Sequence, residues 1–221
     1  MKYLIILLFS ITTFSQSKPI ELKIDAIKTV DNDDHSRKFT LHYHITNLTE
    51  KPIAFVLDTT HIVPIGGGSL RPNPYYKVYE NETSIDVNWI FTNQLSRVFK
   101  DEAELNKYRD SLMNYVESRT PEQLSQSRKE GFLENIQKLA PKETKHFTTV
   151  LSWNKERYHK NDVIEYYISE KEKHFFELHI NLMTEELLSH FTEEEKKEVL
   201  KDKVLTKGWF TSNKVEIDLS E

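Results

Sequence analysis

The chain has 221 residues and no cysteine, and its 30 lysines and arginines face 35 aspartates and glutamates, for a formal charge of −5. Charges of both signs are interspersed without a basic stripe, so nucleic acid is not an expected partner. The length is sufficient for a core that needs neither a disulfide nor a metal to fold.

Residues 1–15 resemble a secretory signal peptide. Lys2 precedes an apolar run from Tyr3 to Phe14, which as a helix would be about 18 Å long, shorter than the ~30 Å of hydrocarbon in a membrane. Cleavage after Ser15 would make Gln16 the first residue of the mature chain. The alternative is a buried first strand or helix.

The rest of the sequence predicts a soluble protein, secreted or periplasmic, from a bacterium. No second apolar segment is long enough to span a membrane, and a lipid anchor would need a cysteine. Secreted eukaryotic domains usually carry disulfides, which this chain cannot form.

Alternating apolar residues predict strands along the first part of the chain. Residues 20–30 alternate, and FTLHYHITNLTEKPIAFVLD (residues 39–58) is typical of two half-buried strands around the turn NLTEKP. A long loop with three glycines occupies residues 61–74. YYKVYE and IDVNWIF then flank NETS as a further hairpin.

A change to steps of three and four predicts helices. Asp101 with Glu104 can cap a first helix, and Thr120 with Gln123 can form a capping box for a second. We expect this helical hairpin at about residues 101–139.

A shorter helical segment is expected at about residues 184–203. The apolar stripe of the hairpin, which includes Leu105, Leu112 and Phe132, is expected to close the two helices on each other and on the strands. The alternative is that the hairpin and the loop from Pro64 to Pro74 border a partner surface.

The strands return in KHFTTVLSW, HFFELHINLM and KVEIDL. Seven or eight strands separated by turns predict a mainly β fold, an antiparallel β-sandwich in which the helices are insertions. We expect residues 16–221 to form this single domain.

Three segments carry a resemblance to a known class of fold. FTLHYHITNLTEKPIAFVL, LAPKETKHFTTVLSW and GWFTSNKVEIDL resemble the strand order of immunoglobulin-like sandwiches in exported bacterial proteins. The bacterial proteinase-inhibitor sandwich family is similar, although the long helical insertions depart from it. The resemblance implies an immunoglobulin-like fold and leaves the activity open. The cysteines of the antibody-type core are absent.

His42 and His44 share one face of a predicted strand and can present two imidazoles to zinc. If the strand that begins near Lys145 lies beside it, His146 becomes a third ligand. We expect no aspartate or glutamate among these outward positions. The sequence therefore favours no bound metal and no cofactor, with solvated histidines, and leaves a zinc site at these three residues as the alternative.

Adjacent tyrosines are candidates for an interaction surface. In an extended chain one member of each pair, Tyr75 with Tyr76 and Tyr166 with Tyr167, must point outward, where it can stack on a sugar ring. The alternative assigns the inward members and the tryptophans to the core, with outer tyrosines stiffening the sheet.

Motifs of catalysis are missing from the sequence. There is no Gly-x-Ser-x-Gly, no thiol, no His-Glu-x-x-His, and no lysine in the glycine-rich loop for phosphate. We therefore expect a non-catalytic binding or structural protein of the bacterial cell envelope, with an unknown protein or glycan partner. The alternatives are a glycan-binding module and a metal-dependent periplasmic enzyme.

Overall fold

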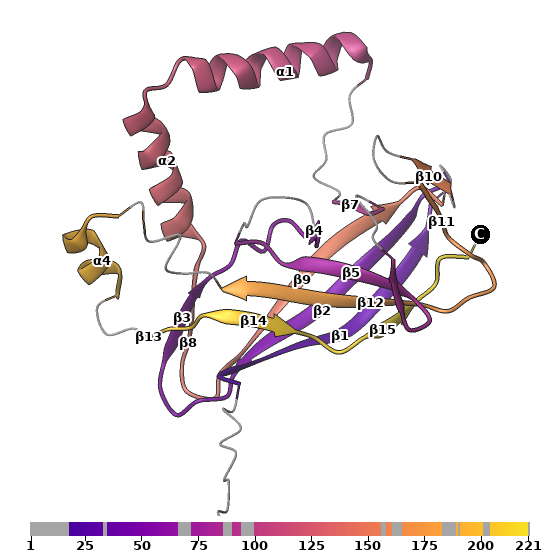
Figure 1. The fold of residues 1–221 in the computed structure, drawn as a ribbon, viewed down its shortest axis with the longest axis horizontal. Helices are drawn as coiled ribbons and strands as arrows, with labels where there is room; N and C mark the ends of the chain where they lie inside the picture. Colours follow the sequence, from indigo (N-terminus) through magenta and orange to yellow (C-terminus); the bar gives the residue numbers. More distant parts are fainter. Residues whose placement is uncertain are drawn as a thin grey trace, which may run out of the picture.

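The computed structural model describes residues 18–32, 35–65, 72–85, 90–93, 100–155, 158–160, 165–182, 189, 191–200 and 204–220. This part of the chain is mainly β, with several antiparallel sheets and few helices (Figure 1). The first fifteen residues, the expected signal peptide, lie outside the described residues, as do Val87 and Trp89 of the predicted second hairpin.

The first sheet is antiparallel, with the strand order β1-β2-β9-β7. In β2 the side chains alternate strictly between buried and half-exposed, which confirms the pattern of the sequence. The strands are β1 (Ile20–Asp31), β2 (Arg37–Asn47), β9 (Thr144–Trp153) and β7 (Thr92–Asn93).

The second sheet has the order β14-β12-β5-β4, and β15 and β6 pair with β12 and β5. Its central strand is buried on both faces. The strands are β14 (Gly208–Thr211), β12 (His174–Leu182), β5 (Tyr75–Glu80), β4 (Val63–Pro64), β15 (Val215–Ile217) and β6 (Thr83–Ile85).

The remaining strands form two smaller sheets. The described residues contain fifteen strands in all, rather than the predicted seven or eight. One has the order β13-β3-β8 and the other pairs β10 with β11. These strands are β13 (Val204–Leu205), β3 (Ile53–Val56), β8 (Ile136–Leu139), β10 (Tyr158–Lys160) and β11 (Glu165–Tyr167).

Two pairings depart from the predicted antiparallel arrangement. β13 pairs with β3 and β4 pairs with β5 in parallel, over two residues each. A parallel pair needs a long connection that returns the chain in the same direction. β4 lies within residues 61–74, which the sequence predicts as one long loop, so two residues of that predicted loop are a strand.

The helices begin where the sequence predicts. Asp101 accepts a hydrogen bond from the Glu104 amide at 2.8 Å, and Thr120 and Gln123 form the reciprocal capping box. The described helices are α1 (Glu102–Glu117), α2 (Pro121–Glu134) and α4 (Glu193–Leu200). α4 falls within the predicted range 184–203, of which residues 184–188, 190 and 201–203 lie outside the described ranges.

The predicted end of the second helix is wrong. α2 ends at Glu134, and residues 136–139 form β8, which pairs antiparallel with β3. Leu139 is 1% exposed, so this segment contributes to the core as a strand. The open edge of β3 offers backbone partners over these residues, and pairing with it overrides a helical pattern that is only local.

The expected closure of the hairpin on the strands is also wrong for α1. Figure 1 shows α1 lying apart from the sheets, and it contains no buried residue. Leu112, Tyr115 and Val116 of its apolar stripe are about half-exposed. α2 buries only Phe132, whose ring contacts Phe191 edge-on at 5.1 Å. An apolar stripe determines which face of a helix can pack. The stripe is buried only if another part of the protein contacts that face.

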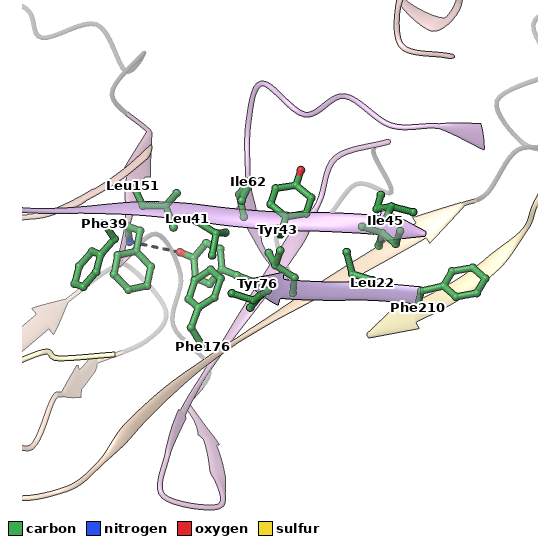
Figure 2. Packing of buried hydrophobic residues seen from close by; sticks show 14 of the residues in the cluster. Leu22, Phe39, Leu41, Tyr43, Ile45, Ile62, Tyr76, Leu151, Phe176 and Phe210 are labelled. Carbon is green, nitrogen blue, oxygen red and sulfur yellow. Dashed lines mark hydrogen bonds between the residues drawn. The ribbon is translucent and has the colours of Figure 1, made fainter. Parts of the chain in front are cut away.

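The core lies between the first and second sheets and draws side chains from both (Figure 2). The rings of Tyr76, Phe91 and Phe176 lie 5.5 to 5.8 Å apart at its centre. The Tyr76 hydroxyl accepts a hydrogen bond from the Phe91 amide at 3.5 Å. Two facing sheets with a shared apolar interior account for the alternation along β2.

Tyr43→Phe is expected to raise the free energy of unfolding by about 1 kcal/mol, because a buried hydroxyl without a partner costs stability. Tyr43 is fully buried, its hydroxyl has no hydrogen-bond partner among the described residues, and burial raises its pKa. Urea unfolding measures the change. Tyr76→Phe, which removes a bonded hydroxyl, is the control and should lose stability; equal losses in both variants would contradict the prediction.

Candidate functional site

Histidines gather on the outer face of the first sheet. His42 and His44 point outward from β2, and β9 lies beside β2 with His146 directly opposite His44. The imidazole rings of His44 and His146 have centroids 5.4 Å apart and are tilted by 58°. The pairing therefore brings together two of the three histidines that the sequence proposed as ligands.

Asp25 joins this pair from the other neighbouring strand. The register between β1 and β2 shifts between Ile24 and Ala26, so Asp25 is the extra residue of a β-bulge. Its Oδ1 lies 2.7 Å from Nδ1 of His44, and its Oδ2 lies 3.5 Å from Nδ1 of His146. One donor atom from each of the three residues lies within 4.8 Å of the others.

The expectation that no acidic residue lies among the outward positions is therefore wrong. The alternation of residues 20–30 already places Glu21 and Asp25 outward, and a hairpin partner lies beside β2. Glu21 contributes as well, since its Oε2 is 3.9 Å from Nε2 of His44. These carboxylates could have been found by reading the neighbouring strand as well as the strand that carries the histidines.

His42 stays apart from this group. It faces Ala26 on β1 and Thr148 on β9, and its Nδ1 lies 3.0 Å from the Thr148 hydroxyl. We call Asp25, His44 and His146 the histidine–aspartate cluster. The side chains of these three residues are 32%, 13% and 72% exposed, so the cluster is open to solvent on one side.

A second group of polar residues lies on the outer face of the second sheet. Glu177 and His179 point outward from β12 and are nevertheless buried. The Tyr79 hydroxyl donates to Oε2 of Glu177 at 2.6 Å, and Nε2 of His179 lies 2.9 Å from the same oxygen. The Thr211 hydroxyl lies 3.2 Å from Nδ1 of His179.

Burial dominates the electrostatics of this second group. Burial, followed by the hydrogen bond to the Glu177 carboxylate and the charge of that carboxylate, raises the pKa of Tyr79 to about 12. Burial also lowers the pKa of His179, against the opposing charge of Glu177. Tyr79 is therefore protonated and His179 favours its neutral form at neutral pH.

An exposed tryptophan lies beside this polar row. Trp209 on β14 faces Asn181 on β12, and its ring centroid is 5.9 Å from that of Tyr75. Trp209 is 51% exposed, whereas Tyr75 is 4% exposed. Two residues along β14, Thr211 shares this face and is exposed. We call Tyr75, Trp209 and Thr211, with the outward residues of β12, the aromatic–polar face.

The structure separates the candidate tyrosines. Tyr75 points outward but is covered, and Tyr76 points into the core. Tyr167 on β11 is 59% exposed, while the side chain of Tyr166 lies outside the described part. The assignment of the tryptophans to the core holds for Trp153 and is wrong for Trp209, because Trp209 lies on the face of β14 opposite to the core residue Phe210.

Surface hollows lie elsewhere. One of about 330 Å³ is bordered by the start of β12 and the C-terminal residues 216–220, and one of about 260 Å³ lies between α2 and residues 58 and 72. Neither is lined by the histidine–aspartate cluster or by Trp209. His146 and Trp209, one from each candidate site, are 72% (side chain) and 51% exposed.

The comparisons with known proteins yield no relative. No model of a protein family, no curated protein and no solved structure matches the chain. The resemblance to exported immunoglobulin-like sandwiches therefore stays a prediction. Every helix among the described residues is too short or too polar to cross a membrane.

Proposed function

We propose that this chain is an exported, non-catalytic binding protein of the bacterial cell envelope, with an immunoglobulin-like sandwich fold, and that it binds carbohydrate through the aromatic–polar face. The observation that carries the proposal is the half-exposed indole of Trp209 on a hydrogen-bonded strand. A tryptophan that could have been buried is instead presented to solvent beside polar groups.

The chemistry of a sugar ring fits this face. One side of a pyranose carries C–H groups that pack on an aromatic plane, and its edge carries hydroxyls that need hydrogen-bond partners. Trp209 offers the plane, and the Thr211 hydroxyl lies on the same face of β14. Tyr75, buried beside the indole, supports its orientation. Residues held on strands lose little freedom on binding, which favours affinity.

The buried acid–base groups support binding over catalysis. Glu177 is 8% exposed and is engaged by Tyr79 and His179. A general acid or base must reach the proton that it transfers. Groups held in this way beneath the surface fit a positioning role, in which they hold the outer face of β12 rigid.

The proposed export and the proposed sandwich fold each rest on a separate observation. The apolar run of residues 3–14 after a single lysine supports export. Two facing sheets around one core support a sandwich. The three segments that resemble immunoglobulin-like strands support that particular variant of it.

Trp209→Ala is expected to weaken carbohydrate binding at least about tenfold, as loss of an aromatic anchor does. A glycan array on the intact protein identifies the ligand, and calorimetry with that ligand compares the variants. Tyr167→Ala removes an equally exposed ring from β11 and is the control, with binding expected to be unchanged. An array without a bound glycan, or wild-type affinity in Trp209→Ala, would refute the proposal.

A further inference from the structure

We propose that Asp25, His44 and His146 bind one divalent transition-metal ion, with zinc as the best match, on the outer face of the first sheet. The proposal does not depend on carbohydrate binding, because the two sites lie on different sheets. It rests on three donors from three adjacent strands, β1, β2 and β9, that converge within 4.8 Å.

The backbone of the sheet places these donors. His44 and His146 occupy directly opposite positions of an antiparallel pair, so ladder hydrogen bonds hold their Cα atoms. Alternation along β1 directs Asp25 to the same face, and the β-bulge sets its position along the strand, where its carboxylate contacts both imidazoles. Without the bulge, His42 would pair with Asp25 rather than with Ala26.

The donor set matches zinc in type and in spacing. Two imidazoles and one carboxylate are ligands that Zn²⁺ accepts, and the open side leaves the fourth position to water. Bonds of about 2.0–2.2 Å in tetrahedral array separate neighbouring donors by about 3.3–3.5 Å. The contact between Asp25 and His146 is 3.5 Å, and that between Asp25 and His44 is 2.7 Å. The two contacts use different oxygens of Asp25, and one donor atom from each residue lies within 4.8 Å of the others, so side-chain movements on the order of 1 Å would bring the donors to this spacing.

Glu21 supplies an outer partner for one ligand. If His44 binds the ion through Nδ1, its Nε2 faces the Glu21 carboxylate 3.9 Å away. Metal-bound histidines characteristically donate their second ring N–H to a carboxylate, which orients the ring. Asp25 and Glu21 together carry two negative charges near a doubly charged cation.

The bound ion would join β1 to β9 across β2. An ion that binds only the folded state stabilises it by an amount that grows with the logarithm of the free zinc concentration above Kd, so zinc should raise the unfolding temperature of the full chain. His42 provides an internal control, because it lies on the same strand face, two residues from His44, and outside the cluster.

The test is titration of chelator-treated full-length protein with Zn²⁺ by calorimetry, with Co²⁺ absorption as a report of coordination. We expect one ion per chain, and at least about tenfold weaker binding in His146→Ala and in Asp25→Asn, the range found when groups around a metal are removed. His42→Ala should bind as the wild type does. His146 has a side chain that is 72% exposed, so its removal should leave the fold intact, as circular dichroism can confirm.

Two results would overturn the proposal. Absence of stoichiometric binding would leave Asp25 as an ion-pair partner of the histidines and no more. Equal weakening in His42→Ala and His146→Ala would indicate nonspecific binding by surface histidines. Carbohydrate binding by the chelator-treated, metal-free protein is expected to equal that of the untreated protein. Failure of the zinc proposal can therefore be distinguished from failure of the carbohydrate proposal.

Discussion

Phe176→Ala is expected to lower the free energy of unfolding by about 3–5 kcal/mol, the range for removing a buried aromatic ring. Phe176 is 1% exposed and lies on β12, the central strand of the second sheet. Its ring stacks on Tyr76 with an interplanar angle of 19° and contacts Phe91 edge-on at 5.8 Å. Phe176 lines the same small apolar hollow as Phe39, Leu41 and Leu151 of the first sheet, and Figure 2 shows these side chains in the core.

The size of this effect follows from where the cavity would form. The void would open between two sheets that are each held by ladder hydrogen bonds, so neither can move freely to fill it. Urea unfolding of the purified variant measures the change. Phe175→Ala removes the same ring from the adjacent, outward position of β12 and should cost clearly less. A loss below about 1 kcal/mol in Phe176→Ala would contradict the assignment of the core.

Asn47→Ala is expected to cost about 2–4 kcal/mol, because it removes several buried hydrogen bonds of about 0.5–1.5 kcal/mol each. Asn47 is fully buried at the end of β2. Its amide nitrogen donates to the carbonyls of Lys51 and Ala140, both at 2.8 Å. Its side-chain oxygen accepts from the amide and the hydroxyl of Thr49 at 2.9 and 2.8 Å.

These bonds tie two connections together, the turn between β2 and β3 and the turn between β8 and β9. Alanine would break this link between the two turns, although the Lys51 carbonyl keeps the Thr49 hydroxyl as a donor and the Ala140 carbonyl keeps the Glu143 amide. Thermal and urea unfolding measure the loss. Asn81→Gly is the control, because Asn81 lies in the other Asn-x-Thr triplet, is exposed, and has a positive φ of 52° that glycine tolerates. Equal stability of the two variants would refute this role.

Much of the local structure could be predicted from the sequence, because its causes are local. The period of two in residues 39–45 specifies a strand with one buried face, whatever lies beside it. The side chains of Asp101 and Thr120 cap helices through bonds to residues three positions ahead. The outward direction of His42, His44 and Asp25 follows from the same alternation.

The composition of the candidate sites depended on pairing between segments far apart in the chain. Only the register of β2 with β9 places His146 opposite His44, and only the bulge in β1 brings Asp25 between them while His42 stays apart. Alternation determines the face of a residue, whereas its neighbours across the sheet depend on strand order and register.

Tertiary structure also determined the secondary structure or burial of segments whose local sequence pattern was ambiguous or misleading. Residues 136–139 became a strand because β3 offered an edge, and the apolar stripe of α1 remained exposed because no sheet lies within its reach. Trp209 is exposed because it lies on the outer face of β14, whereas Phe210, the next residue, points into the core. The sequence by itself therefore determined which face each strand buries and where the helices begin. The partners of those faces were decided by long-range packing and hydrogen bonding, whose free energies exceed local preferences.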